Sequence, residues 1–488
     1  MSENFDLLVK NVQLVRPNQT TVERCDIGIK DGKFVEVGSE ITTTSNQTID
    51  ANGLMAFPGA VDAHMHIGIY RDLSEDAQTE SRAAAQGGVT TTMTYIRSGS
   101  YYLNMGGSWR TFFPEVLCRS EGNYWVDYAY HVSPIESSQI EEMEYLAIEQ
   151  GAPNFGEVFM FYGSHGLHGR SDNQRKWLML PDEDNYDVAH FEQICRMTAH
   201  LQQKHPDLAD QIAVSFHCET PEILRVYEKL IHDAGELDGL EAWSAARPPH
   251  SEAVAIAVVG ALAHAAGLQQ VNILHITSQA AMEASLKARE AWPDVTFGLE
   301  VAAGHLLLDT TATAGPLGKV NPPLRSPEDR EFLWQHVLDG TVEWIITDHA
   351  ACPYDMKVAA DDPTSMWKAR AGFGGTEYLL AGIFSEGTRR GLSPNRVAEL
   401  VCWNPARRFG LTHKGDIAAG FDADLVLFDP NEEWVIDPAD SESSQEYTPF
   451  AGLEVKGKVK RTFLRGEMVF DNGRFVGEKR GKYVKRPS

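Results

Sequence analysis

The sequence has few cysteines and no long apolar run, and both absences narrow what the protein can be. Its six cysteines include no CxxC pair, so neither a disulfide framework nor a zinc-thiolate site is expected. No stretch reaches the roughly 18 consecutive apolar residues of a membrane span. The start, MSENFDLLVKN, lacks the basic and apolar pattern of a secretory signal. We therefore expect a cytoplasmic protein without a membrane partner.

Positive charge is also scarce. The chain has 43 lysines and arginines against 69 aspartates and glutamates, a formal net charge of −26. Such a surface repels nucleic-acid backbones, so no nucleic-acid partner is expected. The length of 488 residues exceeds one ordinary core and predicts two domains, or a large barrel with an accessory part.

The two ends of the chain alternate apolar and polar residues, as half-buried strands do. At the N-terminal end, Asp31-Gly32 is a hairpin-turn pair, and Asn472-Gly473 is its counterpart near the C-terminal end. Two β-rich ends around one large middle region predict a single small β-sandwich domain, because chain termini often lie close together.

The middle of the chain alternates short β-branched and aromatic runs with segments of helical spacing, such as 251–267, 279–292 and 327–340. This alternation predicts an α/β fold, a parallel TIM-like (β/α)8 barrel, with domain limits of 1–54 and 414–488 for the small β domain and 55–413 for the barrel. The eight runs are 57–64, 88–96, 125–132, 156–162, 212–217, 271–277, 295–301 and 342–348.

Five metal-ligand side chains fall at the ends of these runs. His64 and His66 in DAHMH lie two residues apart, so a strand would point both toward one face. The C-terminal strand ends of a barrel surround one centre. Imidazole and carboxylate groups suit zinc and its neighbours. The expected ligands of a divalent ion are His64, His66, His217, His275 and Asp348.

Several segments carry a family resemblance: AFPGAVDAHMH, HCE, LHITS, KVNPPLR, ITDHAACPY, WNPARRFGL and GDIAAGFDADLVLFDP. In order along nearly the whole chain, they resemble the cyclic amidohydrolases of the amidohydrolase superfamily, and most of all hydantoinases and dihydropyrimidinases. The resemblance implies a metal-dependent barrel with a small β domain, a small-molecule substrate, and a homotetramer or homodimer.

One position departs from the family pattern. Strand four of these enzymes ends in a carboxylated lysine that bridges two metals, and that position aligns here with Gly163. Three interpretations stay open: a single ion, a nearby side chain in place of the lysine, or a metal-poor, non-catalytic scaffold. Glu157 is six residues from Gly163, about 20 Å along a strand, and is set aside as too distant. His165 is the preferred replacement, and one ion is expected rather than two.

Substrate contacts can also be named. Asn321 lies in KVNPPLR, a segment that resembles a substrate-binding segment of the family. Arg97, just beyond the second strand, could hold an anionic group. His165 or His168 could donate to an oxyanion in place of the family's tyrosine. The aromatic loop 98–113 would suit an apolar ring, or could instead pack at a subunit interface.

The predicted activity is hydrolysis of a C–N amide bond in a cyclic amide, imide or ureide, or in an aryl amide. Metal-activated water would attack the carbonyl, with Asp348 as general base and acid. His275 would bind or protonate the substrate if only one ion is held. Zinc is the expected metal, with manganese or iron as alternatives. A mononuclear deaminase and a non-catalytic scaffold are the competing hypotheses.

Overall fold

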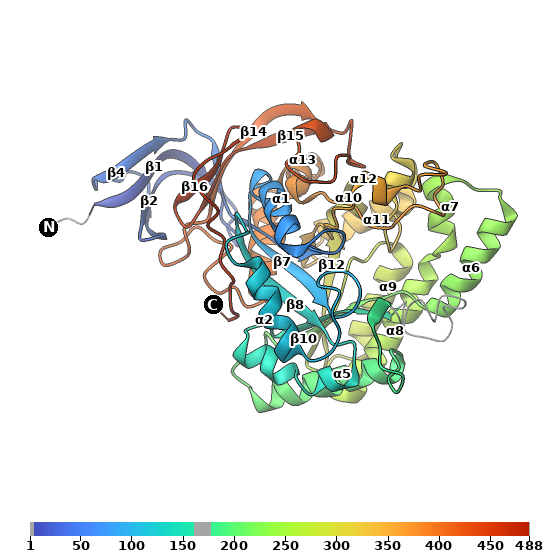
Figure 1. Ribbon diagram of the computed structural model, residues 1–488. Coiled ribbons are helices and arrows are strands. Elements are labelled where there is room, and N and C mark those ends of the chain that lie inside the picture. The colour runs from blue at the N-terminus through green and yellow to red at the C-terminus, as the bar shows by residue number, and fades with distance from the viewer. Residues whose placement is uncertain (1–3, 161–176, 488) are drawn as a thin grey trace.

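The computed structural model describes residues 4–160 and 177–487, and its centre is a nearly closed barrel of eight parallel strands (Figure 1). Each strand hydrogen-bonds to the next in chain order, and the peptide N–H of His66 donates to the carbonyl of His349 (2.8 Å) where the first and last strands meet. The predicted barrel is confirmed. Its strands are β6 Ala60–Met65, β7 Val89–Arg97, β8 Asp127–Ser133, β9 Asn154–Phe159, β10 Ala213–His217, β11 Gln270–Ile273, β12 Thr296–Ala302 and β13 Trp344–Ile346.

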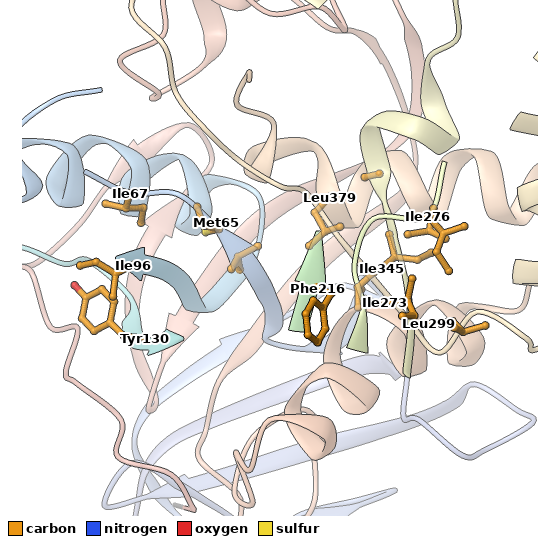
Figure 2. Packing of buried hydrophobic residues seen from close by; sticks show 14 of the residues in the cluster. Met65, Ile67, Ile96, Tyr130, Phe216, Ile273, Ile276, Leu299, Ile345 and Leu379 are labelled. Carbon is orange, nitrogen blue, oxygen red and sulfur yellow. The ribbon is translucent and has the colours of Figure 1, made fainter. Parts of the chain in front are cut away.

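The barrel strands are buried along nearly their whole length, which explains why their sequences read as continuous apolar or β-branched runs. Figure 2 shows Phe216, Ile273 and Ile345, from three of these strands, in one packed cluster. Helices lie outside the barrel: α1 Leu73–Gln86, α2 Trp109–Ser120, α3 Ser137–Ile140, α5 Val188–Lys204, α6 Pro221–Ala234, α7 Gly239–Ala246, α8 Pro249–Ala266, α9 Gln279–Ala291, α10 Ala303–Leu307, α11 Pro327–Leu338, α12 Tyr354–Lys357, α13 Leu379–Arg389, α14 Pro394–Ala398 and α15 Asn404–Arg408.

Both ends of the chain meet in a second sheet of nine strands, beside the barrel in Figure 1. Its order is β17-β16-β15-β14-β5-β1-β2-β3, with β4 paired to β1. The predicted union of the two ends is therefore present. The strands are β1 Phe5–Leu14, β2 Glu23–Lys30, β3 Lys33–Gly38, β4 Ser45–Asp50, β5 Met55–Pro58, β14 Leu425–Val435, β15 Glu454–Leu464, β16 Glu467–Asp471 and β17 Arg474–Phe475.

The predicted hairpin pairs have the expected backbone. Asp31 and Gly32 join β2 to β3 with φ of 50° and 74°, and Asn472 and Gly473 join β16 to β17 with φ of 46° and 85°. Positive φ at both central residues is the type I′ geometry, whose twist matches the flanking strands.

A buried charge cluster joins the barrel to the sheet domain. The Lys414 ammonium contacts the carboxylates of Asp127 (2.9 Å), Asp422 (3.1 Å) and Asp424 (2.7 Å). Arg465 of the sheet domain also pairs with Asp127, which lies on β8. The three aspartates are close enough to hold a metal ion, but the lysine ammonium already supplies the countercharge. We read this cluster as a structural link.

No helix in the described part of the chain is long and apolar enough to cross a membrane.

Candidate metal centre

Three predicted ligands meet where the first and last barrel strands adjoin. His64 lies on β6 and His66 directly follows it, so both imidazoles point to one side. Their Nε2 atoms lie 3.3 Å and 3.1 Å from Oδ1 of Asp348, which comes two residues after β13. All three side chains are buried.

The other two predicted ligands face the same centre from the opposite strands. His217 ends β10, and His275 follows β11 by two residues. His275 and Asp348 have positive φ, 31° and 56°, which turns each side chain at the strand end. Non-glycine residues rarely adopt this backbone, and such conformations gather at functional sites.

Glu157 of β9 lies between the two groups. Its Oε1 is 2.8 Å from Nδ1 of His217 and 3.0 Å from Nε2 of His275. Its Oε2 is 3.6 Å from Nε2 of His64 and 3.4 Å from Nε2 of His66. The carboxylate thus faces one histidine pair with each oxygen, and the glutamate side chain is 1% exposed.

This position corrects the expectation that Glu157 is too distant to act here. That distance was measured from Gly163, but β9 ends at Phe159, so the strand meets the centre at residue 157. A Cβ on Gly156 would lie 2.6 Å from the carbonyl oxygen of Ser215, so glycine lets β9 approach β10 just before Glu157. Gly163, His165 and His168 lie outside the described residues.

The donor set fits divalent metal ions. His217 contacts carboxylates through both nitrogens, Glu157 at Nδ1 and Glu219 at Nε2 (2.8 Å each). A neutral imidazole has one N–H, so if it donates to Glu219, the Nδ1 lone pair faces the oxygen of Glu157. This contact therefore needs either a proton or a metal ion between Nδ1 of His217 and the oxygen of Glu157. Nε2 of His64 and Oε2 of Glu157 are buried without a hydrogen-bond partner, as metal-ligand atoms would be.

Neighbouring charges shift the pKa values of Glu157 and His217. Burial opposes ionisation of Glu157, but hydrogen bonds from His217 and His275 outweigh it and hold the pKa of Glu157 well below its usual value. Burial also opposes protonation of His217, whereas Glu157 and Glu219 raise its pKa to about 9. The candidate metal centre therefore stabilises positive charge next to the ionised carboxylates of Glu157 and Glu219.

A second layer of side chains orients the ligands. Nδ1 of His64 contacts Oε1 of Glu300 (2.8 Å), and Nδ1 of His66 contacts the hydroxyl of Tyr102 (3.0 Å). Glu219, which holds His217, is in turn paired with Arg247 (2.6 Å). Partners of this kind fix the tautomer and direction of metal-binding imidazoles.

Two of the predicted substrate contacts, Arg97 and Asn321, lie within the described residues. Arg97 and Asn321 line one cavity of about 770 Å³. Arg97 is 4% exposed and donates to the carbonyls of Ser98 (3.0 Å) and Ser100 (3.2 Å). Asn321 accepts a hydrogen bond from the indole of Trp243 (3.2 Å).

Some aromatic residues of the loop 98–113 lie in the core and others lie at the cavity or at a candidate metal-ligand histidine, a division that the loop's sequence does not predict. Trp109, Phe112 and Phe113 are fully buried in the core around α2, so the apolar-ring expectation does not extend to them. Tyr101, by contrast, lines the cavity, and Tyr102 contacts His66.

Two carboxylates of this centre, Glu300 and Glu219, were missed from the sequence, and Glu157 was set aside as too distant. Glu157 and Glu300 each stand alone among apolar residues of a barrel strand, and Glu219 directly follows HC in HCE. A glutamate is rarely fully buried unless it has a partner, so a solitary one in a buried strand is the signal that could have found Glu157 and Glu300.

Comparisons with known proteins agree with this geometry. The chain is 32% identical to an allantoinase of Rubrobacter xylanophilus over 486 residues, covering 99% of this chain and 98% of that protein. It is 29% identical to an allantoinase of Escherichia coli over 472 residues, 96% of each chain. The profile of the Amidohydrolase family matches residues 345–469.

Solved structures of hydantoinases and dihydropyrimidinases share the fold. The L-hydantoinase (dihydropyrimidinase) of Arthrobacter aurescens superposes with a TM-score of 0.84 at 27% identity, covering 99% of this chain and 100% of the other. The dihydropyrimidinase of Brevibacillus agri gives a TM-score of 0.83 at 26% identity, over 98% of each chain. With its full-length similarity to a relative above 30% identity, this chain belongs to the amidohydrolase family, as a cyclic amidohydrolase of the kind that includes allantoinases and hydantoinases.

Proposed function

We propose that the protein opens the ring of a cyclic amide, imide or ureide by hydrolysing a C–N bond, and that the four histidines, Asp348 and Glu157 would hold two divalent metal ions for this reaction. The observation that carries this proposal is the placement of the Glu157 carboxylate between two histidine pairs. Names of the relatives point to allantoin, hydantoin and dihydropyrimidine rings as the first compounds to test.

Two ligand groups support the count of ions. One comprises His64, His66 and Glu157, with Asp348 beside the two histidines; the other comprises Glu157, His217 and His275. The expectation of a single ion rested on the loss of an anionic bridge, and the Glu157 carboxylate, which faces both histidine pairs, would take that place. Zinc suits these imidazole and carboxylate donors, with manganese or iron as alternatives.

Metal ions at such a site supply a water of low pKa and polarise the carbonyl under attack. Asp348 is the residue to move the proton. Its Oδ1 faces both His64 and His66, so its carboxylate borders the place where water is activated. We propose that Asp348 accepts a proton from the attacking water and passes it to the leaving ring nitrogen, as one carboxylate serving as base and then acid.

The remaining side chains position these groups. His275 was a candidate for substrate protonation if only one ion is held; its Nε2 instead faces Glu157, which favours the ligand role. Asn321 and Arg97 border the cavity where the ring and its substituent would sit. The aryl-amide alternative differs only in the substrate, because attack and proton transfer would use the same groups.

Metal content and reaction products test the proposal together. Protein purified without chelator should contain close to two metal ions per chain and should open at least one cyclic ureide or amide. Asp348→Asn should lower kcat by two to four orders of magnitude. The variant must still bind metal for the result to report on proton transfer.

Other outcomes would favour the alternatives. Release of ammonia without ring opening would indicate a deaminase. A metal content near zero that added zinc or manganese does not restore would indicate a non-catalytic scaffold. One ion per chain, with full activity, would contradict the bridging role of Glu157.

A further inference from the structure

The cavity lined by Arg97 and Asn321 is rich in positive charge, although the whole chain carries −26. Its lining includes two acidic residues, and both have basic partners: Glu228 pairs with Arg247 (3.1 Å), and Asp233 with Lys229. The basic residues of the lining outnumber them and are Arg97, Arg225, Lys229, Arg247, Lys319 and Arg370.

Two of these arginines flank one tyrosine. The guanidinium of Arg97 lies 6.0 Å from the ring centroid of Tyr101, and Nη1 of Arg370 lies 3.5 Å from its hydroxyl. Arg370 also lies 6.0 Å from the ring of Tyr70, which packs edge-on against Tyr101 (6.1 Å between centroids). We call these four residues, Tyr70, Arg97, Tyr101 and Arg370, the arginine–tyrosine cluster.

The cluster lacks an internal countercharge. Within residues 4–160 and 177–487, no carboxylate lies within ion-pair distance of Arg97 or Arg370. Arg97 is held by backbone carbonyls, whereas Arg370 is exposed at the cavity. A planar guanidinium can bind a carboxylate through two parallel N–H bonds. The rings of Tyr70 and Tyr101, beside Arg370, offer planar apolar surfaces for a ligand to pack against.

The cluster is connected to the proposed reaction centre. Arg97 lies 6.0 Å from the ring of Tyr102, whose hydroxyl contacts His66. Tyr70 comes four residues after His66. One side chain, Tyr102, therefore stands between Arg97 of the cluster and the proposed metal ligand His66.

We propose that the arginine–tyrosine cluster binds a carboxylate carried on the side chain of the cyclic substrate, with Arg370 as its direct partner. This inference rests on the proposed ring-opening function and narrows the substrate to a cyclic amide or ureide with an anionic substituent. A cationic cavity in an acidic protein also concentrates such anions at the entrance.

A matched pair of compounds tests the proposal. Hydantoin-5-acetate and hydantoin-5-acetamide have the same ring and nearly the same shape, and differ in charge. The kcat/KM of the acid should exceed that of the amide by about tenfold, in keeping with a charge-assisted hydrogen bond. Arg370→Gln should reduce this ratio by about tenfold, and Arg370→Lys, which keeps the charge, should retain most of it.

A control and a second readout separate this inference from the proposed function. Arg24, exposed on β2 of the sheet domain, provides the matched variant Arg24→Gln, which should leave the ratio unchanged. Trp177 and Trp243 line the cavity, so binding of both compounds to metal-loaded protein can be followed by tryptophan fluorescence.

The outcomes are distinct. If both compounds are opened equally well, or if Arg370→Gln leaves the ratio unchanged, the carboxylate site is wrong and the hydrolase proposal stands. If neither compound nor any other cyclic amide is opened, but the acid binds more tightly than the amide in an Arg370-dependent way, the hydrolase proposal fails and the anion site stands. Equal binding without turnover would overturn both.

Discussion

Glu157 carries the sharpest prediction for a single residue. Glu157→Gln keeps the size and removes the charge, so the two ligand groups lose their shared anion. We expect metal content to fall from about two ions per chain to one or fewer, as measured by elemental analysis and by calorimetric metal titration. Glu149→Gln is the control, since the Glu149 side chain is 61% exposed. Unchanged metal content in Glu157→Gln would contradict the bridging role.

The same residue makes a prediction about carbon dioxide. A carboxylated lysine needs carbon dioxide to form, whereas the Glu157 carboxylate is part of the chain itself. Metal uptake by metal-free protein should therefore proceed to the same extent in bicarbonate-depleted and bicarbonate-rich buffer. Uptake that rises with bicarbonate would point to a carboxylated lysine elsewhere, and metal titration followed by mass spectrometry of the intact chain would reveal it.

The five candidate metal-ligand residues could be predicted from the sequence, but the residue proposed in place of the family's bridging lysine could not. The four histidines and Asp348 fall at strand ends, where a barrel gathers side chains, and the structure brings these five together. Glu157 was set aside because the lysine position was taken from local alignment to Gly163, and β9 ends four residues earlier, at Phe159. The length of a strand inside a barrel depends on its neighbours, and local sequence does not report it.

Among the elements, the loop that contains Asn321 is held by a buried ion pair. Arg325 pairs with Glu252 of α8 and donates to the hydroxyl of Thr277 (3.0 Å), two residues beyond His275. Arg325→Leu leaves the carboxylate of Glu252 buried without its partner, which should lower the free energy of unfolding by about 3–5 kcal/mol. Urea unfolding measures this change. The double variant with Glu252→Gln should recover part of the loss, and additive losses would contradict the pairing argument.

The segment that follows β13 contains a buried lysine that makes stability depend on pH. The Lys357 ammonium donates to the carbonyls of Lys319 (2.8 Å) and Gly372 (2.7 Å), and burial lowers its pKa from 10.5 to about 7. Between these values the unfolded chain binds a proton that the native chain does not, so the free energy of unfolding rises with pH. Below pH 7 both states are protonated, and the cost of burying the charge is present in full.

The comparison with Lys357→Met isolates this group. The free energy of unfolding of the wild type, minus that of the variant, should increase from pH 7 to pH 9 by up to about 1.4 kcal/mol per pH unit. Chemical denaturation at several pH values measures it. A difference that stays constant, or that shrinks as the pH rises, would show that Lys357 keeps its proton in the native state.

Elements were easier to predict than the contacts between them. Each barrel strand is buried, so its apolar run is visible in the sequence. The arginine–tyrosine cluster combines the last residue of β7 with loops that follow β6, β7 and β13, and no periodicity links residues 70, 97, 101 and 370. Such contacts depend on tertiary packing, which local patterns do not encode.

At the scale of the whole molecule, Lys414 links the barrel to the sheet domain, and we expect the two to unfold together. Lys414→Met would leave three buried or half-buried aspartates together, with Arg465 beside Asp127 and Lys33 beside Asp422 as the remaining paired cations. We expect a loss of about 3–5 kcal/mol and a single thermal transition at lower temperature. Lys10→Met, which removes an ion pair of 3.7 Å from a lysine 38% exposed, should change the stability by less than about 1 kcal/mol. Two separated transitions in the wild type would contradict the link.

The strand order of the sheet domain affects how this domain can form during synthesis of the chain. β5 pairs with β14, yet β5 ends at Pro58 and β14 begins at Leu425, with the entire barrel between them. A ribosome therefore delivers the first half of this sheet long before the second. Until β14 has been synthesised, one edge of β5 has no strand to pair with. An unpaired strand edge can pair with another chain and so promote aggregation. The growing chain should need protection from aggregation most while the barrel is being made.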